Sequence, residues 1–128
     1  MVSFDGFQPE GGSPIYQQII LHIKRGMVAG TVLHGDELPS RRVLSALLAV
    51  NPNTVQKAYR LLEEEGLIQS HSGAKSYVVL EEETLAAIRT ELVEADARGA
   101  VRTLRQMGIS REEAFALLNK YWDGGDTE

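Results

Sequence analysis

The residues most able to do chemistry in this chain lie in one basic stretch, residues 40–62. The chain has 128 residues, with 18 acidic against 13 basic side chains, yet this stretch contains no Asp or Glu. Its basic residues are Arg41, Arg42, Lys57 and Arg60. Guanidinium and ammonium groups bind phosphates, and Asn, Gln and Thr side chains bind the edges of bases. A basic stretch in an acidic chain indicates a surface for a polyanion, with a chance clustering of cations as the alternative.

Other kinds of chemistry find little support. The chain has no cysteine, which excludes disulfides and thiolate metal sites. His22, His34 and His71 are scattered without a His or Glu at ligand spacing, so each is expected to be a surface or turn residue, and no metal or cofactor is expected. No nucleophile elbow, phosphate loop or pair of acids is visible, and Ser40 and Ser72 lack a His–Asp/Glu pattern. The chain is therefore not expected to be an enzyme.

The basic stretch falls on two short helix patterns. Ser40 is expected to cap a helix that carries Val43, Leu44, Leu47 and Leu48. Asn51 followed by proline is a second helix start, and this helix is expected to run to about residue 65 and stop at a glycine. Two short helices joined by a few residues predict a helix-turn-helix unit.

The second of these helices has two unlike faces. At about 100° per residue, Val55, Ala58 and Leu62 share one side, and polar or basic residues share the other. A solvated surface helix is the alternative. The absence of acids on the polar face, together with the arginines that begin the preceding helix, favours a helix that enters the major groove. The residues expected to contact DNA here are Ser40, Arg41, Arg42, Asn53, Thr54, Gln56, Lys57 and Arg60.

Further elements flank the two helices. Residues 14–29 predict a first helix, with Ser13 as N-cap, Pro14 as its first residue and Gly30 as its stop. After the basic stretch, a short strand is predicted to begin at residues 67–68, followed by a turn at 71–74 and a second strand at 76–79. Three helices and a hairpin in this order are the plan of a winged helix-turn-helix domain.

The last third of the chain predicts two more helices. The first opens near Thr84 and is broken by Gly108, and the second starts at a capping box formed by Ser110 and Glu113. Two helices make a poor core by themselves, so pairing with a second subunit is expected, with folding back on the first domain as the alternative. The residues expected in a dimer interface are Leu85, Ile88, Leu92, Val101, Leu104, Phe115, Leu118, Tyr121 and Trp122.

The whole chain is thus expected to be of the α+β class. Residues 1–12 predict a flexible arm, 13–80 a winged helix-turn-helix domain with three helices and a two-stranded wing, 81–122 a two-helix dimerisation segment, and 123–128 a frayed tail. No signal peptide or membrane span is visible, and the expected location is the cytoplasm. The expected partners are double-stranded DNA and a second copy of the chain.

Four motifs resemble the GntR family of bacterial transcription regulators. They are PIYQQI at 14–19, GDELPSRR at 35–42, VNPNTV at 50–55 and LLEEEGLI at 61–68, and the resemblance covers about residues 13–79. The short tail is similar to that of the YtrA subfamily. The resemblance implies a homodimeric regulator, expected to be a repressor of an inverted-repeat operator. It also implies DNA contacts from Arg42 and from a wing tip at Ser72 and Gly73. At the start of the recognition helix, it implies contacts from Asn51, Asn53 and Thr54.

The sequence departs from the family pattern at three places. Arg41 replaces a usual acid, Pro52 replaces an Arg that many relatives carry, and the wing reads Gly73-Ala74-Lys75 where Gly-Arg-Gly is usual. Lys75 is expected to restore the lost cation of the wing. A winged-helix protein-interaction module without DNA binding is the alternative function. Whether a small-molecule effector exists is left open, although a pocket at a dimer interface is conceivable.

Overall fold

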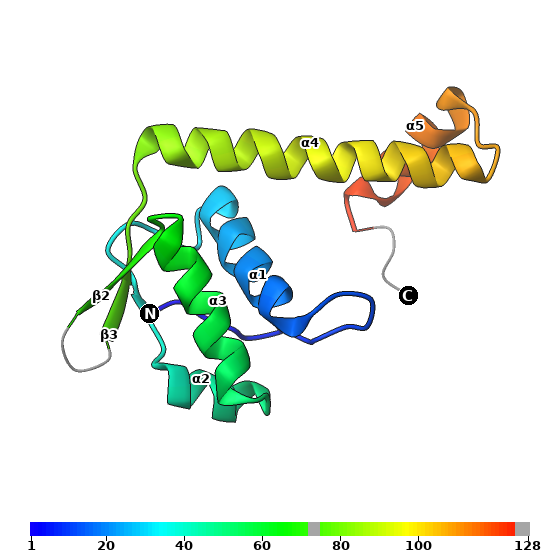
Figure 1. Cartoon of the computed structure of the whole chain (residues 1–128). Coiled ribbons are helices and arrows are strands. Elements are labelled where there is room, and N and C mark those ends of the chain that lie inside the picture. The colour runs from blue at the N-terminus through cyan, green and yellow to red at the C-terminus, as the bar shows by residue number, and fades with distance from the viewer. Residues whose placement is uncertain (72–74, 125–128) are drawn as a thin grey trace. The chain divides into compact units, whose positions relative to one another are not determined.

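The computed structural model describes residues 1–71 and 75–124. The chain forms two compact units, Met1–Arg89 and Thr90–Glu128, and the boundary between them falls inside the helix α4. Figure 1 shows the order of the elements. Each unit is described here on its own.

The first unit begins with α1 (Ile15–Ala29), as predicted. Pro14, not Ser13, occupies the N-cap, and the Ser13 carbonyl instead accepts a hydrogen bond from the Gln18 side chain at 2.9 Å. Gly30 ends the helix with φ of 85°, a left-handed conformation that costs glycine little. Helical spacing places the apolar side chains on one face, of which Ile19, Ile23 and Met27 are buried.

The helix-turn-helix consists of α2 (Arg41–Leu48) and α3 (Pro52–Glu64), and both predicted starts are confirmed. Ser40 Oγ accepts a hydrogen bond from the Val43 amide at 3.1 Å. Asn51 Oδ1 accepts one from the Asn53 amide at 2.8 Å. Each side chain satisfies an amide that the first turn leaves without a helical partner.

The sheet contains β1 (Glu37–Leu38), β2 (Ile68–His71) and β3 (Lys75–Val78), antiparallel in the order β1-β3-β2. The predicted hairpin is present, but the prediction of a two-stranded wing was incomplete. Two residues are too few to show the alternation of a strand, so β1 was missed. Residues 72–74 of the predicted turn lie outside the described residues.

The first residues of the chain pack against the first unit. Val2 and Phe4 are buried, and the Val2 amide donates to the Glu37 carbonyl at 2.8 Å. The Phe4 ring stacks on His22 of α1, with 4.6 Å between ring centres. Residues 2–4 are therefore anchored by apolar burial and a backbone hydrogen bond, in place of the loose arm expected from the glycines nearby.

The second unit holds the end of α4 (Glu82–Gln106) and all of α5 (Arg111–Trp122). Gly108 separates them with φ of 74°, and Ser110 Oγ accepts from the Glu113 amide at 3.1 Å, as predicted. Leu104 and residues of α5 line a hollow of about 280 Å³. No side chain of α5 is buried. Among the described residues, no helix is both long and apolar enough to cross a membrane.

Candidate nucleic-acid interface

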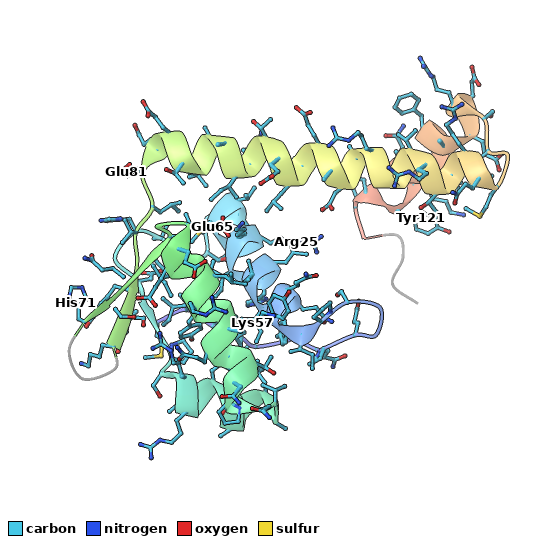
Figure 2. All side chains as sticks on the ribbon, viewed as in Figure 1. Arg25, Lys57, Glu65, His71, Glu81 and Tyr121 are labelled. Carbon is cyan, nitrogen blue, oxygen red and sulfur yellow. The ribbon has the colours of Figure 1, made fainter. Side chains whose placement is uncertain are left out.

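The predicted two-faced character of α3 is present in the structure. Val55, Ala58 and Leu62 are fully buried, and so is Tyr59, which the sequence did not indicate. The polar residues of the opposite face, Asn53, Gln56, Lys57 and Arg60, are exposed, and Thr54 is half-buried. Figure 2 shows α3 with its side chains, Lys57 labelled on it. An exposed face of donors and acceptors on a helix anchored by its other face is suited to reading base edges.

The caps Ser40 and Asn51 position this surface. Their side-chain oxygens already accept the hydrogen bonds that start α2 and α3. These oxygens accept the capping bonds, while the Ser40 hydroxyl hydrogen and the side-chain NH2 of Asn51 remain able to donate to a ligand. Both residues were predicted as DNA contacts, and a capping role explains why these residue types stand there.

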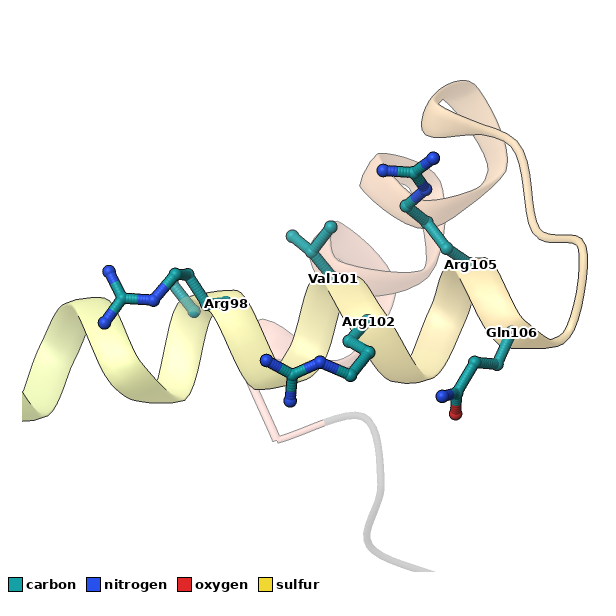
Figure 3. Close-up of a pocket in the computed structure, with 6 residues that line it drawn as sticks. Arg98, Val101, Arg102, Arg105 and Gln106 are labelled. Atoms are coloured by element: carbon teal, nitrogen blue, oxygen red, sulfur yellow. The ribbon is translucent and has the colours of Figure 1, made fainter.

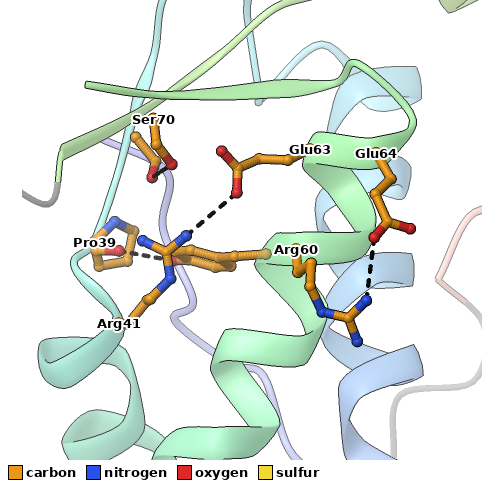
Figure 4. A network of polar contacts seen from close by, with 8 residues as sticks. Pro39, Arg41, Arg60, Glu63, Glu64 and Ser70 are labelled. Atoms are coloured by element: carbon orange, nitrogen blue, oxygen red, sulfur yellow. Dashed lines mark hydrogen bonds and ion pairs between the residues drawn. The ribbon is translucent and has the colours of Figure 1, made fainter. Parts of the chain in front are cut away.

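Arg41 makes contacts inside the domain. Its guanidinium lies 5.2 Å from the centre of the Tyr59 ring, and its Nη2 lies 3.5 Å from Glu63 Oε1. The side chain is 23% exposed. Figure 4 shows the guanidinium directed toward Glu63. Arg41 thus joins the first turn of α2 to the second half of α3, and its predicted role as a DNA contact has no support from its surroundings.

Tyr59 is the buried partner in this network. Its hydroxyl donates a hydrogen bond to the Pro39 carbonyl at 2.7 Å. Burial raises the pKa of Tyr59 well above its usual value of about 10, and the nearby Arg41 guanidinium lowers it by less. The phenol is therefore neutral and remains a donor at any pH at which the protein is studied. It fixes α3 to the segment that leads into α2.

Two further cations of the basic stretch have partners. Arg60 Nη1 lies 3.1 Å from Glu64 Oε2, and both side chains are more than half exposed. Lys57 Nζ lies 4.1 Å from the centre of the Tyr16 ring on α1. Exposed ion pairs and cation–π contacts are each worth about 1 kcal/mol or less, so a phosphate can displace either one. The Arg60–Glu64 pair nevertheless reduces the net charge presented at Arg60, whereas the neutral Tyr16 ring leaves the charge of Lys57 in place.

Arg42 differs from the other three cations. It is exposed in the first turn of α2, and in the described part of the chain no carboxylate lies within ion-pair distance of it. The uncompensated positive charge of the surface is therefore concentrated at Arg42 and Lys57, whereas the sequence indicated all four cations. The Arg60–Glu64 pair could have been found from its spacing of four residues. The Arg41–Glu63 pair could not, because 22 residues separate its members.

The wing supplies Lys75, which is exposed on β3 opposite His71 of β2. The ring of His71 lies 5.2 Å from that of Tyr77, which the sequence had not singled out. Ser72 and Gly73, the predicted wing-tip contacts, lie outside the described residues. No group of three or more His, Asp and Glu side chains comes together as a metal site in the regions that the structure describes.

The residues predicted for a dimer interface divide between the two units. Ile88 is buried in the first unit, and Leu85 is half-buried there. In the second unit, Leu92 and Leu104 are half-buried. The large apolar side chains left exposed in that unit include Val101, Phe115, Leu118, Tyr121 and Trp122. The second unit therefore carries most of the unsatisfied apolar surface of this set.

Replacing Arg41 with Met tests its internal role. We expect the variant to lose about 1–2 kcal/mol of unfolding free energy, because the methionine keeps the alkyl packing but leaves Glu63 without its partner. Equilibrium denaturation measures this loss. The salt dependence of DNA binding should remain that of the wild type. A slope reduced as much as for loss of a phosphate contact would instead place Arg41 on the DNA.

Comparison with known proteins shows which protein family this chain resembles. A family model described as bacterial regulatory proteins, gntR family, matches residues 15–78. The chain is 38% identical over 112 residues to the HTH-type transcriptional repressor YtrA of Bacillus subtilis (strain 168). That alignment covers 88% of this chain and 82% of YtrA.

Solved structures agree with the family model. A GntR family transcriptional regulator from Listeria monocytogenes is 30% identical with a TM-score of 0.75, over 88% of this chain and 98% of that one. AraR(DBD), solved in complex with operator ORX1, is 28% identical with a TM-score of 0.50, over 62% of this chain and 95% of that one. The winged helix-turn-helix fold predicted from the sequence is thereby confirmed.

Proposed function

The chain belongs to the gntR family of bacterial regulatory proteins, and from this premise we propose that it is a homodimeric repressor that binds an inverted-repeat operator in double-stranded DNA. The observation that carries the proposal is the exposed polar face at the start of α3, beside an exposed cation on α2 for which the described part of the chain offers no ion-pair partner. Asn53 and Gln56 are placed to reach base edges, and Arg42 to bind phosphate. The similar AraR(DBD), solved on its operator, and the similar repressor YtrA support this assignment.

The exposed apolar surface of α5 supports a homodimer. None of its side chains is buried, although it carries Phe115, Leu118, Tyr121 and Trp122. Exposed aromatic and aliphatic groups at this density are costly in water and mark an association surface. A second copy buries the same groups from both sides and places two α3 helices on one duplex, as an inverted repeat requires.

The salt dependence of DNA binding tests the proposal. The purified protein should retain specific fragments of its own genome, and affinity for the recovered fragment should fall steeply as salt rises. The cause is counterion release, at about 0.9 in log–log slope for each phosphate contact. Affinity that is weak at low salt and does not change with salt would contradict the proposal and favour a winged-helix protein-interaction module.

Replacing Gln56 with Ala is expected to relax base preference. Its exposed amide can bond bidentately to adenine, and such a pair is worth about 1–3 kcal/mol of discrimination. The ratio of operator to random-DNA affinity should therefore fall by about fivefold or more, while random-DNA affinity changes little. Competition binding with the two DNAs measures the ratio. The same change at Gln106 on α4 is the matched control, and an equal effect of both substitutions would argue against base reading by α3.

A further inference from the structure

The second unit carries a row of charged side chains on one face of α4. The row, named here the α4 charge stripe, consists of Glu91, Glu94, Arg98, Arg102 and Arg105. Steps of three and four residues keep these side chains within one narrow strip of a helix. All five are exposed. The acids occupy the earlier turns and the arginines the later turns, so the two signs are separated along the helix.

The charges of the stripe are mostly unpaired within the chain. Arg98 Nη1 lies 3.5 Å from Glu94 Oε1, with both side chains more than 60% exposed. Glu91, Arg102 and Arg105 have no ion-pair partner among the described residues. Figure 3 shows the three arginines along α4, where they line a hollow of about 640 Å³ together with Ala97, Val101 and Gln106.

The spacing of the stripe makes it complementary to itself. The pair formed by positions 91 and 105 and the pair formed by positions 94 and 102 have the same midpoint, residue 98. In two antiparallel helices related by a two-fold axis at that residue, each acid therefore lies level with an arginine of the other helix. The levels lie about 10 Å and about 6 Å from the axis at 1.5 Å per residue. A parallel pair in register would place like charges together.

We propose that a second copy of the chain docks on the α4 charge stripe with its α4 antiparallel, so that Glu91 meets the partner's Arg105 and Glu94 meets the partner's Arg102. This inference rests on the homodimer of the proposed function and adds its orientation and register. Arg98 lies at the axis, where its contact with Glu94 of its own chain offsets the approach of the second Arg98. Val101, 53% exposed beside the stripe, adds apolar area to the same contact.

The charge pattern favours a second copy over an anionic ligand. A small anion on the arginines would leave Glu91 and Glu94 unmatched and would be repelled by them. A second copy in antiparallel orientation places its basic end beside the acidic end of the first copy, and its acidic end beside the basic end. One isologous contact therefore pairs all of these charges. Charges that flank a helix pair commonly decide its partner and orientation in this way.

A charge-swap experiment tests the inference. One variant carries E91R and E94R, and the other carries R102E and R105E. Each variant alone brings like charges together across the axis, and its dimer dissociation constant should rise at least about tenfold, as sedimentation velocity at low salt would measure. An equimolar mixture should form heterodimers with affinity close to that of the wild type, because positions 91, 94, 102 and 105 are then all basic in one stripe and all acidic in the other, while Arg98 is unchanged in both.

A matched control carries R89E and R111E, which change the net charge as much as R102E and R105E do but lie off the stripe. It should dimerise like the wild type, and circular dichroism should show that every variant is folded. Wild-type affinity in both single-stripe variants, or no recovery in the mixture, would overturn the inference while leaving the homodimer intact. If both single-stripe variants dimerise like the wild type, and inorganic polyphosphate binds the wild type but not R102E/R105E, the arginines bind an anionic ligand, and the inference is likewise overturned. A monomeric wild type would remove the homodimer itself.

Discussion

Replacing Arg42 with Ala is expected to weaken operator binding by about 1–3 kcal/mol for each subunit, the usual range for loss of a charged DNA contact. A dimer loses the contact twice, so its affinity should fall by about 30-fold or more at fixed salt. Arg42 is chosen because it is exposed in the first turn of α2 and has no carboxylate partner in the described part of the chain. Its charge is therefore available to phosphate without breaking an internal contact.

Fluorescence anisotropy with an operator duplex at several salt concentrations measures this effect. If Arg42 binds one phosphate in each subunit, the log–log salt slope should fall by about 2. R60A is the matched control, because Arg60 is already engaged by Glu64 and should contribute less. An unchanged affinity and an unchanged salt slope for the Arg42 variant would show that Arg42 does not bind a DNA phosphate. This result would weaken the assignment to DNA binding.

The second large effect is expected from α5. Replacing Phe115 and Trp122 with Asp should convert the protein to a monomer, because these side chains, 59% and 81% exposed, are those that a partner would cover. A charged carboxylate in a desolvated interface is costly unless it is paired. Operator affinity should then fall by about a hundredfold or more, because binding of the second half-site ceases to be intramolecular.

Light scattering measures the loss of the dimer, and operator titration on the same sample measures the loss of DNA affinity. L33D is the matched control, since Leu33 is 57% exposed but lies in the first unit. Thermal unfolding of the α5 variant should change little in the monomeric state, because neither side chain is buried in the chain. A variant that remains dimeric with full operator affinity would remove α5 from the interface and move the dimerisation surface elsewhere on the chain.

Much of the local structure of both units could be predicted from the sequence because its signals are local. Ser40, Asn51 and Ser110 each cap an amide two or three residues away, and Gly30 ends α1 at the position its neighbours specify. The apolar spacing in α3 likewise names three of its buried residues. Interactions within one helical turn produce a periodic pattern of residue types, so helix starts, helix ends and buried faces could be predicted from the sequence.

The candidate DNA-binding surface could be predicted in part for the same reason. The exposed polar residues of α3 follow from its periodicity, and the family motifs name Arg42. The four cations of the stretch suggested a larger positive charge than the surface presents, however, because the sequence does not show which carboxylates form ion pairs with them. Glu64 is near enough in the chain to have been noticed, whereas Glu63 reaches Arg41 only after α2 and α3 have packed together.

The amino-acid sequence by itself determined the helices, the wing hairpin and the exposed polar face of α3, because these depend on neighbours within a few positions, and its motifs indicated the family. Only the tertiary structure decided that β1 joins the sheet, that Val2 and Phe4 are buried, and that Arg41 is held by Tyr59 and Glu63. These contacts join segments about 20 or more residues apart in the chain. Such contacts form only when whole helices and strands pack together. They produce no periodic pattern in the sequence, so the sequence does not predict them.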